Sequence, residues 1–174
     1  LQDEMIKKGI DIKFNTNIED IVETNEGLEI KIKQGTSITV ACVLSALGRS
    51  PNVDQLNLDK IGILQKKNGA IIVDDFSKTN IDHIYAIGDV TDRINLTPVA
   101  IREGHAFADT EFGNNKRSAS HKNIPSTVFT DPPLSTVGIT TEEALKLGIK
   151  VKTFKTQFSP MKYTFADKKP KILM

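Results

Sequence analysis

The sequence predicts an α/β fold that begins with a β-meander and continues through strand-to-helix connections. Residues 18–23 and 28–33 alternate apolar and polar side chains on either side of a turn at 24–27, which is typical of an antiparallel hairpin with one solvated face. Residues 37–47 are almost wholly apolar, as expected for a strand buried on both sides of a parallel sheet. The short apolar segment 84–87 ends at Gly88-Asp89 and precedes a helical segment at 97–112. Strand and helix signals therefore occur in one chain, with a meander first.

The other elements are justified by local pattern. An amphipathic helical turn or two ends at Gly9, the turn Asn68-Gly69 leads into a strand, and Thr140-Thr141-Glu142-Glu143 opens a helix that ends at Gly148. Residues 113–120 are polar and lack periodicity, which is typical of a linker. Further strands are expected at 11–14, 70–74, 126–129, 136–139 and 150–155, a partly helical stretch at 54–63, and the beginning of a strand at 171–174.

Charge and hydropathy exclude several classes of function. The 174 residues carry 23 basic and 22 acidic side chains, for a net charge of +1, and so provide no basic surface for nucleic acid or an anionic membrane. No apolar run approaches the roughly 20 residues of a membrane span, and the first residues lack the pattern of a signal peptide. We therefore expect a cytoplasmic protein that binds neither nucleic acid nor membrane, and we expect no metal site.

The single cysteine, Cys42, lies within the apolar run 37–47. One cysteine cannot form an internal disulfide, and a thiol in a buried strand is usually inert packing. We expect Cys42 to be such a buried residue.

The most specific local signal is the strand end at Gly88-Asp89. Ligands of open α/β sheets bind outside the carboxyl ends of the strands, where a glycine permits close approach and an Asp can accept a hydrogen bond from a polyol hydroxyl. A generic turn after a strand is the alternative for this pair.

A second signal follows at residues 96–101, Leu-Thr-Pro-Val-Ala-Ile. Pro98 fixes φ at the start of the helix and leaves backbone N–H groups free, which gives a partial positive charge suited to the electron-rich pyrimidine edge of a reduced flavin. An ordinary helix that starts with proline is the alternative.

Five motifs in register carry a resemblance to a known family. They are Ala-Leu-Gly-Arg-Ser-Pro-Asn at 46–52, the segment 79–90, the segment 96–101, Ile-Pro-Ser-Thr-Val-Phe at 124–129 and Thr-Val-Gly-Ile-Thr at 136–140. In this order and spacing the chain resembles the glutathione reductase family of pyridine nucleotide-disulfide oxidoreductases over essentially its whole length. The resemblance implies Rossmann-like FAD- and NAD(P)-binding fragments with a β-meander, followed by the start of an α+β dimerisation domain.

The resemblance also implies three domain segments. Residues 1–51 correspond to the C-terminal part of an NAD(P)H-binding domain, 52–122 to the C-terminal part of an FAD-binding domain, and 123–174 to the start of an interface domain through which a homodimer forms. The implied cofactors are FAD and NADP(H), and the preference for NADPH over NADH comes from the resemblance alone.

For the flavin, the resemblance implies that Asp89, with Gly88 before it, binds the ribityl chain. Leu96 and Thr97 then lie at the helix start beneath the isoalloxazine ring.

For the nicotinamide cofactor, it implies that Gly48 and Arg49 lie against the cofactor with the guanidinium near the phosphates, a task suited to the forked donors of arginine. The backbone carbonyl of Thr127 approaches the nicotinamide amide. A surface arginine in a turn is the alternative for Arg49.

The implied substrate is glutathione disulfide. Ile101 and His105 share a helix face toward it, and Phe158 and Met161 resemble the pair that reaches it across the dimer, with core packing at a strand end as the alternative. Some members of the family carry an arginine at the position of His105, whereas trypanothione reductases carry a small residue. Trypanothione-like or other thiol disulfides are therefore the second substrate class, and dihydrolipoamide dehydrogenases resemble the chain less.

Several parts of such an enzyme are missing from the sequence. Neither Gly-x-Gly-x-x-Gly motif, nor the redox pair Cys-x-x-x-x-Cys, nor the His-Pro-Thr with its glutamate occurs. We therefore expect no catalytic residue in this segment, which would be inactive by itself as a fragment of the enzyme. The alternative is a noncatalytic module that keeps the nucleotide-domain scaffold for binding or assembly.

Overall fold

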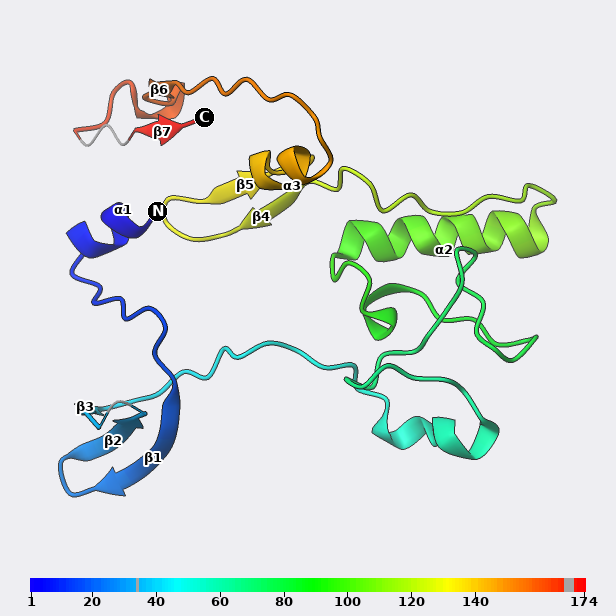
Figure 1. The fold of residues 1–174 in the computed structure, drawn as a ribbon, viewed down its shortest axis with the longest axis horizontal. Coiled ribbons are helices and arrows are strands. Elements are labelled where there is room, and N and C mark those ends of the chain that lie inside the picture. The colour runs from blue at the N-terminus through cyan, green and yellow to red at the C-terminus, as the bar shows by residue number, and fades with distance from the viewer. Residues whose placement is uncertain (34, 168–170) are drawn as a thin grey trace. The chain divides into compact units, whose positions relative to one another are not determined.

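The structure is a computed structural model that describes residues 1–33, 35–167 and 171–174, and Figure 1 shows its helices and strands. The chain divides into two compact units. The first contains Leu1–Lys122 and Val128–Leu134, and the second contains Asn123–Thr127 and Ser135–Met174. Each unit is described by itself.

The first unit opens with helix α1 (Gln2–Lys7) and a three-stranded antiparallel sheet in the order β1-β2-β3. The strands, blue in Figure 1, span Ile18–Thr24, Gly27–Ile32 and Ser37–Val40. The opening helix and the meander are thus confirmed. In the turn between β1 and β2, Gly27 has a φ of +131°, and a Cβ there would lie 2.7 Å from the carbonyl oxygen of Val40. This close approach requires glycine.

The apolar run 37–47 does not form the buried strand that the sequence predicts. Strand β3 ends at Val40, which pairs with Leu28 near the start of β2, next to the turn that precedes this strand. Because β2 extends only one residue further, residues 41–47 have no strand to pair with in the described part of the chain. Leu44 and Leu47 are 91% and 95% exposed. Cys42 is likewise exposed, so the expectation of a buried thiol is wrong.

Four other predicted strands, at 11–14, 70–74, 84–87 and 150–155, are absent from the described residues. Two of these segments make only single bridges, Gln65 with Ile71 and Lys78 with Tyr85. Their backbone groups bond to loops instead: the N–H of Ile71 donates to the carbonyl of Val90 at 3.0 Å. A strand requires a neighbour alongside over several residues, and each of these contacts involves one pair.

The core of the first unit includes residues of, and directly beside, the two 3₁₀ turns at Asp54–Leu56 and Leu58–Ile61. These turns confirm the partly helical stretch predicted at 54–63. Partly buried apolar side chains surround the core. The buried cluster itself consists of Val53, Leu58, Ile63, Ile71 and Ala86.

Helix α2 (Thr97–Phe112) has the bounds that the sequence predicts, with Pro98 in its first turn. It packs against the 3₁₀ turn η3 (Gly88–Thr91). The buried residues of α2 are Val99, Glu103 and Ala106. Their spacing places all three on one helix face, so a glutamate occupies the middle of the buried stripe.

The second unit is built from short elements, which pair as β4 with β5 and as β6 with β7. Helix α3 begins after Thr140, whose side chain accepts from the N–H of Glu143 while the Glu143 carboxylate accepts from the N–H of Thr140. This reciprocal cap confirms the predicted helix start. The predicted strand at 136–139 occurs earlier in the chain, because Gly138 has a φ of +85° and interrupts extended backbone. The elements are β4 (Ser126–Val128), β5 (Leu134–Thr136), α3 (Thr141–Lys146), β6 (Gln157–Phe158), η4 (Met161–Tyr163) and β7 (Ile172–Leu173).

Candidate functional site

The turn at Gly88 approaches helix α2 closely. Gly88 is buried with a φ of +73°, and a Cβ at this position would lie 3.0 Å from the Cβ of Ala100. A side chain is therefore disfavoured both by the backbone conformation and by the space. Glycine at 88 lets the η3 turn lie against the first turns of α2.

Asp89 follows within the same turn, and its side chain is exposed. The carboxylate has no hydrogen-bond or ion-pair partner among the described residues. Both oxygens are thus free to accept hydrogen bonds, as the binding of a polyol hydroxyl requires.

The N-terminus of α2 has no side-chain cap: Leu96 at the N-cap is half-buried and apolar, and Thr97 is exposed. The N–H groups of an uncapped first turn remain available to a ligand, and the helix dipole favours negative charge there. Asp89 and the start of α2 together fit a flavin, with an acceptor for ribityl hydroxyls and donors for the ring's electron-rich edge.

Arg49 and Asp89 line one open pocket of about 170 Å³. The segment 50–52 forms its wall, and Val90 and Asn95 complete it. Gly48, directly before Arg49, has a φ of +124° that other residues rarely adopt. The sequence assigned these two charged residues to different cofactors, whereas the structure brings them to the same pocket.

The two residues expected to face the substrate lie on the surface of α2. Ile101 is 53% exposed and His105 is exposed, and their spacing of four places them on one face. His105 also lines a small pocket of about 110 Å³ with Arg102 and Arg117. Arg117 is paired with Asp109 at 2.6 Å, whereas Arg102 has no ion-pair partner among the described residues, so one cationic side chain at this pocket is available to an anion.

The other predicted site residues lie in the second unit. The Thr127 and Ser135 hydroxyls hydrogen-bond to each other at 3.0 Å. Phe158 in β6 is exposed and Met161 in η4 is 91% exposed. Core packing was the alternative for Phe158 and Met161, and the exposure of Met161 contradicts it for that residue.

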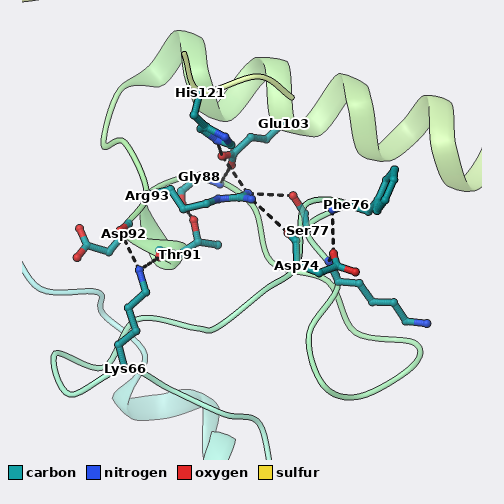
Figure 2. A network of polar contacts seen from close by, with 11 residues as sticks. Lys66, Asp74, Phe76, Ser77, Gly88, Thr91, Asp92, Arg93, Glu103 and His121 are labelled. Carbon is teal, nitrogen blue, oxygen red and sulfur yellow. Dashed lines mark hydrogen bonds and ion pairs between the residues drawn. The ribbon is translucent and has the colours of Figure 1, made fainter. Parts of the chain in front are cut away.

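The structure adds one residue that the sequence analysis missed, Glu103. Figure 2 shows its side chain reaching from α2 to the η3 turn, where Arg93 and His121 also converge. The N–H of Gly88 donates to Oε2 of Glu103 at 2.6 Å. Arg93 Nη2 lies 2.9 Å, and His121 Nε2 2.6 Å, from the other carboxylate oxygen. The available signal was an acidic residue within the apolar stripe of a helix.

The Glu103 carboxylate remains ionised despite its burial. Burial raises its pKa, but the Gly88 N–H, the hydrogen bond with His121 and the charge of Arg93 together outweigh that effect and hold the pKa below its usual value. Charge-assisted hydrogen bonds from three donors account for this sign. Glu103 thus serves as a fixed negative charge at the base of the turn.

Arg93 ties the same carboxylate to a neighbouring loop. Its guanidinium also donates to Ser77 Oγ at 3.0 Å and to the carbonyl of Asp74 at 3.4 Å, as Figure 2 shows. Its buried Nε has no partner among the described residues. The guanidinium therefore links α2, the η3 turn and the loop at 74–77.

The far side of the turn is fixed by a second set of bonds. The hydroxyl of Thr91 donates to the carbonyl of Gly88 at 2.8 Å, and Lys66 Nζ donates to the carbonyls of Thr91 and Asp92, each at 3.0 Å. Hydrogen bonds from Asn95 and Asn68 hold the pKa of Asp92 below its usual value. The backbone on both sides of Asp89 is thus restrained.

Two family models match the chain. The model described as pyridine nucleotide-disulphide oxidoreductase matches residues 1–104, and its dimerisation domain matches residues 124–174. The chain belongs to the pyridine nucleotide-disulphide oxidoreductase family. This finding confirms the predicted fold class, and the predicted cofactors, FAD and NADP(H), are those that this family uses.

Characterised relatives include two kinds of reductase. A glutathione reductase of Burkholderia cepacia is 38% identical over 174 residues, which is 100% of this chain and 39% of the relative. A trypanothione reductase of Trypanosoma congolense is 41% identical over 172 residues, 98% of this chain and 35% of the relative. The chain thus spans about two fifths of the length of the relatives it matches.

Among solved structures, the chain is similar to the HOCl-induced flavoprotein disulfide reductase RclA from Escherichia coli. The TM-score is 0.86 at 28% sequence identity, covering 99% of this chain and 40% of that one. Within the described residues, no helix is long and apolar enough to cross a membrane.

Proposed function

We propose that this chain is part of an FAD-dependent NADPH:disulfide oxidoreductase whose substrate is glutathione disulfide. The observation that carries the proposal is the exposed, unpaired carboxylate of Asp89 on a turn packed against the uncapped start of α2. This arrangement fits a flavin, and it occurs in a chain of a family that uses one.

The net reaction takes NADPH, glutathione disulfide and a proton to NADP⁺ and two molecules of glutathione. The bound flavin supplies two-electron transfer between nicotinamide and a cysteine pair. The chain itself contains one cysteine, so the dithiol belongs to sequence outside these residues. The residues here have the tasks of binding and orienting.

We assign the flavin contacts to the first unit. Asp89 accepts a hydrogen bond from a ribityl hydroxyl, Gly88 gives the close approach, and Leu96 and Thr97 offer N–H groups at the start of α2.

We assign the nicotinamide contacts to Gly48, Arg49 and the carbonyl of Thr127. The open pocket shared by Arg49 and Asp89 supports a site in which an anionic dinucleotide lies near the flavin.

The proposed domain division is 1–51 for the NAD(P)H-binding part, 52–122 for the FAD-binding part and 123–174 for the interface part. The match of 124–174 to a dimerisation domain supports assembly as a homodimer. We place the intact enzyme in the cytoplasm.

The proposed substrate contacts are Ile101 and His105 on α2 and, from the interface part, Phe158 and Met161. The basic pocket around His105 supports an anionic substrate such as glutathione disulfide. The similarity to a trypanothione reductase supports trypanothione-like disulfides as the second candidate. A noncatalytic module built on the same scaffold is the third.

One experiment separates these candidates. The protein that contains this chain is purified from its source, its mass and visible flavin absorbance are recorded, and NADPH oxidation is followed with glutathione disulfide and with trypanothione disulfide. A flavoprotein that prefers glutathione disulfide agrees with the proposal, and preference for trypanothione disulfide selects the second substrate. A colourless protein without either activity leaves only the noncatalytic module.

His105→Arg tests the substrate contact. A guanidinium stays charged and offers forked donors to a carboxylate, so the variant should lower the KM for glutathione disulfide severalfold at about pH 8. A partly solvated charge contact of about 1 kcal/mol has this size. Turnover should change little, because the contact stabilises ground and transition states alike.

The matched control is His83→Arg, which makes the same change at an exposed histidine elsewhere in the first unit. Equal KM values for wild type and His105→Arg would show that His105 does not contact the substrate.

A further inference from the structure

Glu103 is a charged residue within the buried stripe of α2. Only 2% of it is exposed, and it shares the buried face of α2 with Val99 and Ala106. Replacing buried ion pairs by well-packed apolar side chains is often neutral or stabilising. The carboxylate therefore calls for an explanation beyond packing.

The two carboxylate oxygens have different partners. Oε1 is bound by Arg93 and His121, both side chains, whereas Oε2 accepts the backbone N–H of Gly88 at 2.6 Å. Figure 2 shows Glu103 between these partners. The Arg93 and His121 side chains thus orient the carboxylate, and the carboxylate in turn holds the N–H of Gly88 at the start of the η3 turn.

That N–H belongs to the peptide group between Ile87 and Gly88, one peptide group before the one that joins Gly88 to Asp89. The N–H of Gly88 is held by Glu103, and its carbonyl accepts the hydroxyl of Thr91 at 2.8 Å. With both groups of Gly88 bonded, the backbone from which the Asp89 side chain projects has little freedom. The Asp89 carboxylate has no partner of its own among the described residues, so its direction is set by this backbone.

We propose that Glu103 is a positioning residue for the flavin, which orients Asp89 through the N–H of Gly88 while Arg93 and His121 hold the carboxylate in place. The proposal rests on the proposed function, since it requires Asp89 to bind the cofactor. It assigns a cofactor-binding task to a side chain that is not expected to touch the cofactor.

A carboxylate suits this position better than an amide. Three donors surround Glu103, and a carboxylate accepts at both oxygens. A glutamine has one oxygen and would direct its NH₂ group at another donor. Glu103→Gln should therefore retain only part of the positioning of Asp89, and Glu103→Leu should retain none of it.

The test measures FAD binding in the intact protein that contains this chain. Wild type, Glu103→Gln, Glu103→Leu and the control Leu58→Ala are compared for the Kd of FAD, the shape of the visible flavin absorbance and hydrogen exchange at Gly88. Leu58 lies in the apolar core of the same unit and is not among the hydrogen-bond or ion-pair partners of Glu103, so its truncation should lower thermal stability without removing a bond of the network.

We expect Glu103→Leu to raise the Kd of FAD about tenfold or more, the size of one lost charge-assisted hydrogen bond. Glu103→Gln should raise it less, and both variants should alter the flavin spectrum and speed exchange at Gly88. Leu58→Ala should change none of these at a comparable loss of melting temperature. Variants of Glu103 that bind FAD as wild type does, with the same spectrum, would overturn the proposal.

Two further outcomes are informative. If wild type binds no FAD, the proposed function itself fails, which is distinct from loss of the positioning role alone. If Glu103→Leu does not fold, His121→Ala takes its place, because that side chain is partly exposed and contacts only Oε1. A Kd raised about threefold agrees with the proposal, and an unchanged Kd contradicts it.

Discussion

Asp89 is an exposed aspartate like many others, but the backbone of the turn that carries it is restrained by hydrogen bonds. Surface carboxylates without partners are common in proteins. The N–H and the carbonyl of Gly88, however, which belong to the two successive peptide groups before Asp89, are both hydrogen-bonded, and this glycine lies against α2. A side chain that is free at its tip and fixed at its base is suited to receive a ligand.

Asp89→Ala in the intact protein should weaken FAD retention. A polyol hydroxyl that loses a charged acceptor costs about 1.5 to 3 kcal/mol, or roughly ten- to a hundredfold in Kd. The measurement is flavin content after gel filtration, with titration of the apoprotein by FAD. Asp82→Ala, which removes an exposed carboxylate paired with Lys78, is the control. Equal flavin content in wild type and Asp89→Ala would reduce Asp89 to a turn residue.

Glu103 should make stability depend on pH in the acid range. Its folded pKa lies below the ordinary value of 4.5, with burial opposed by the Gly88, His121 and Arg93 contacts. In this pH range the unfolded chain therefore binds more protons than the folded chain. The contribution of Glu103 to the free energy of unfolding is fully present above about pH 4.5 and is lost as the pH falls through the folded pKa.

The comparison is of melting temperatures for wild type and Glu103→Gln from about pH 6 to about pH 3. Breaking one side of a buried ionic cluster should cost about 3 kcal/mol near neutrality, and the difference should shrink in acid. The control Glu142→Gln removes an exposed i,i+4 pair with Lys146, which is worth little at any pH. A difference that stays constant down to pH 3 would contradict the assignment.

Elements whose signals are local were predictable from sequence, and elements that need a distant partner were not. Helix α2 begins and ends where its proline and periodicity predict, and α3 follows its capping box. The segments 70–74 and 84–87 have strand composition, yet each makes only one bridge. Composition reports a preference for extended backbone, whereas a strand also requires a neighbour that the local sequence does not specify.

Thr140→Ala should destabilise the second unit by about 1 kcal/mol, because an N-cap side chain satisfies a backbone N–H that is otherwise unpaired. The variant also loses the hydrogen bond that the Thr140 hydroxyl donates to the Glu143 carboxylate at 2.9 Å, whereas the bond from the Thr140 N–H to that carboxylate remains. The measurement is the denaturant midpoint of the intact protein. Thr141→Ala, at the first helical position, is the matched control and should change the midpoint much less.

Across the whole molecule, the sequence predicted candidate ligand-binding residues but not the buried residue that supports their turn. Gly88, Asp89 and Leu96 stand in motifs that can be read along the chain. Glu103 acquires its meaning only when Arg93, His121 and Gly88 converge on it. Because this convergence arises from the folded backbone, sequence motifs do not predict it.

The isolated 174-residue chain should neither retain FAD on gel filtration nor reduce glutathione disulfide. Thiol–disulfide exchange by this chemistry uses two cysteines, and the chain has one, Cys42, which is exposed.

The same chain should also associate with itself. Large apolar side chains that are more than nine-tenths exposed include Leu44, Leu47, Phe129 and Met161, and exposed apolar surface of this kind marks contact with other protein. Sedimentation and the binding of a hydrophobic dye measure this directly, with the intact protein as the comparison. We expect open-ended, concentration-dependent association and strong dye binding for the isolated chain, whereas the intact protein should remain a discrete dimer with weak dye binding. A monodisperse, yellow and active preparation of these 174 residues would show that the apolar surface needs no cover and that the flavin contacts assigned here suffice by themselves.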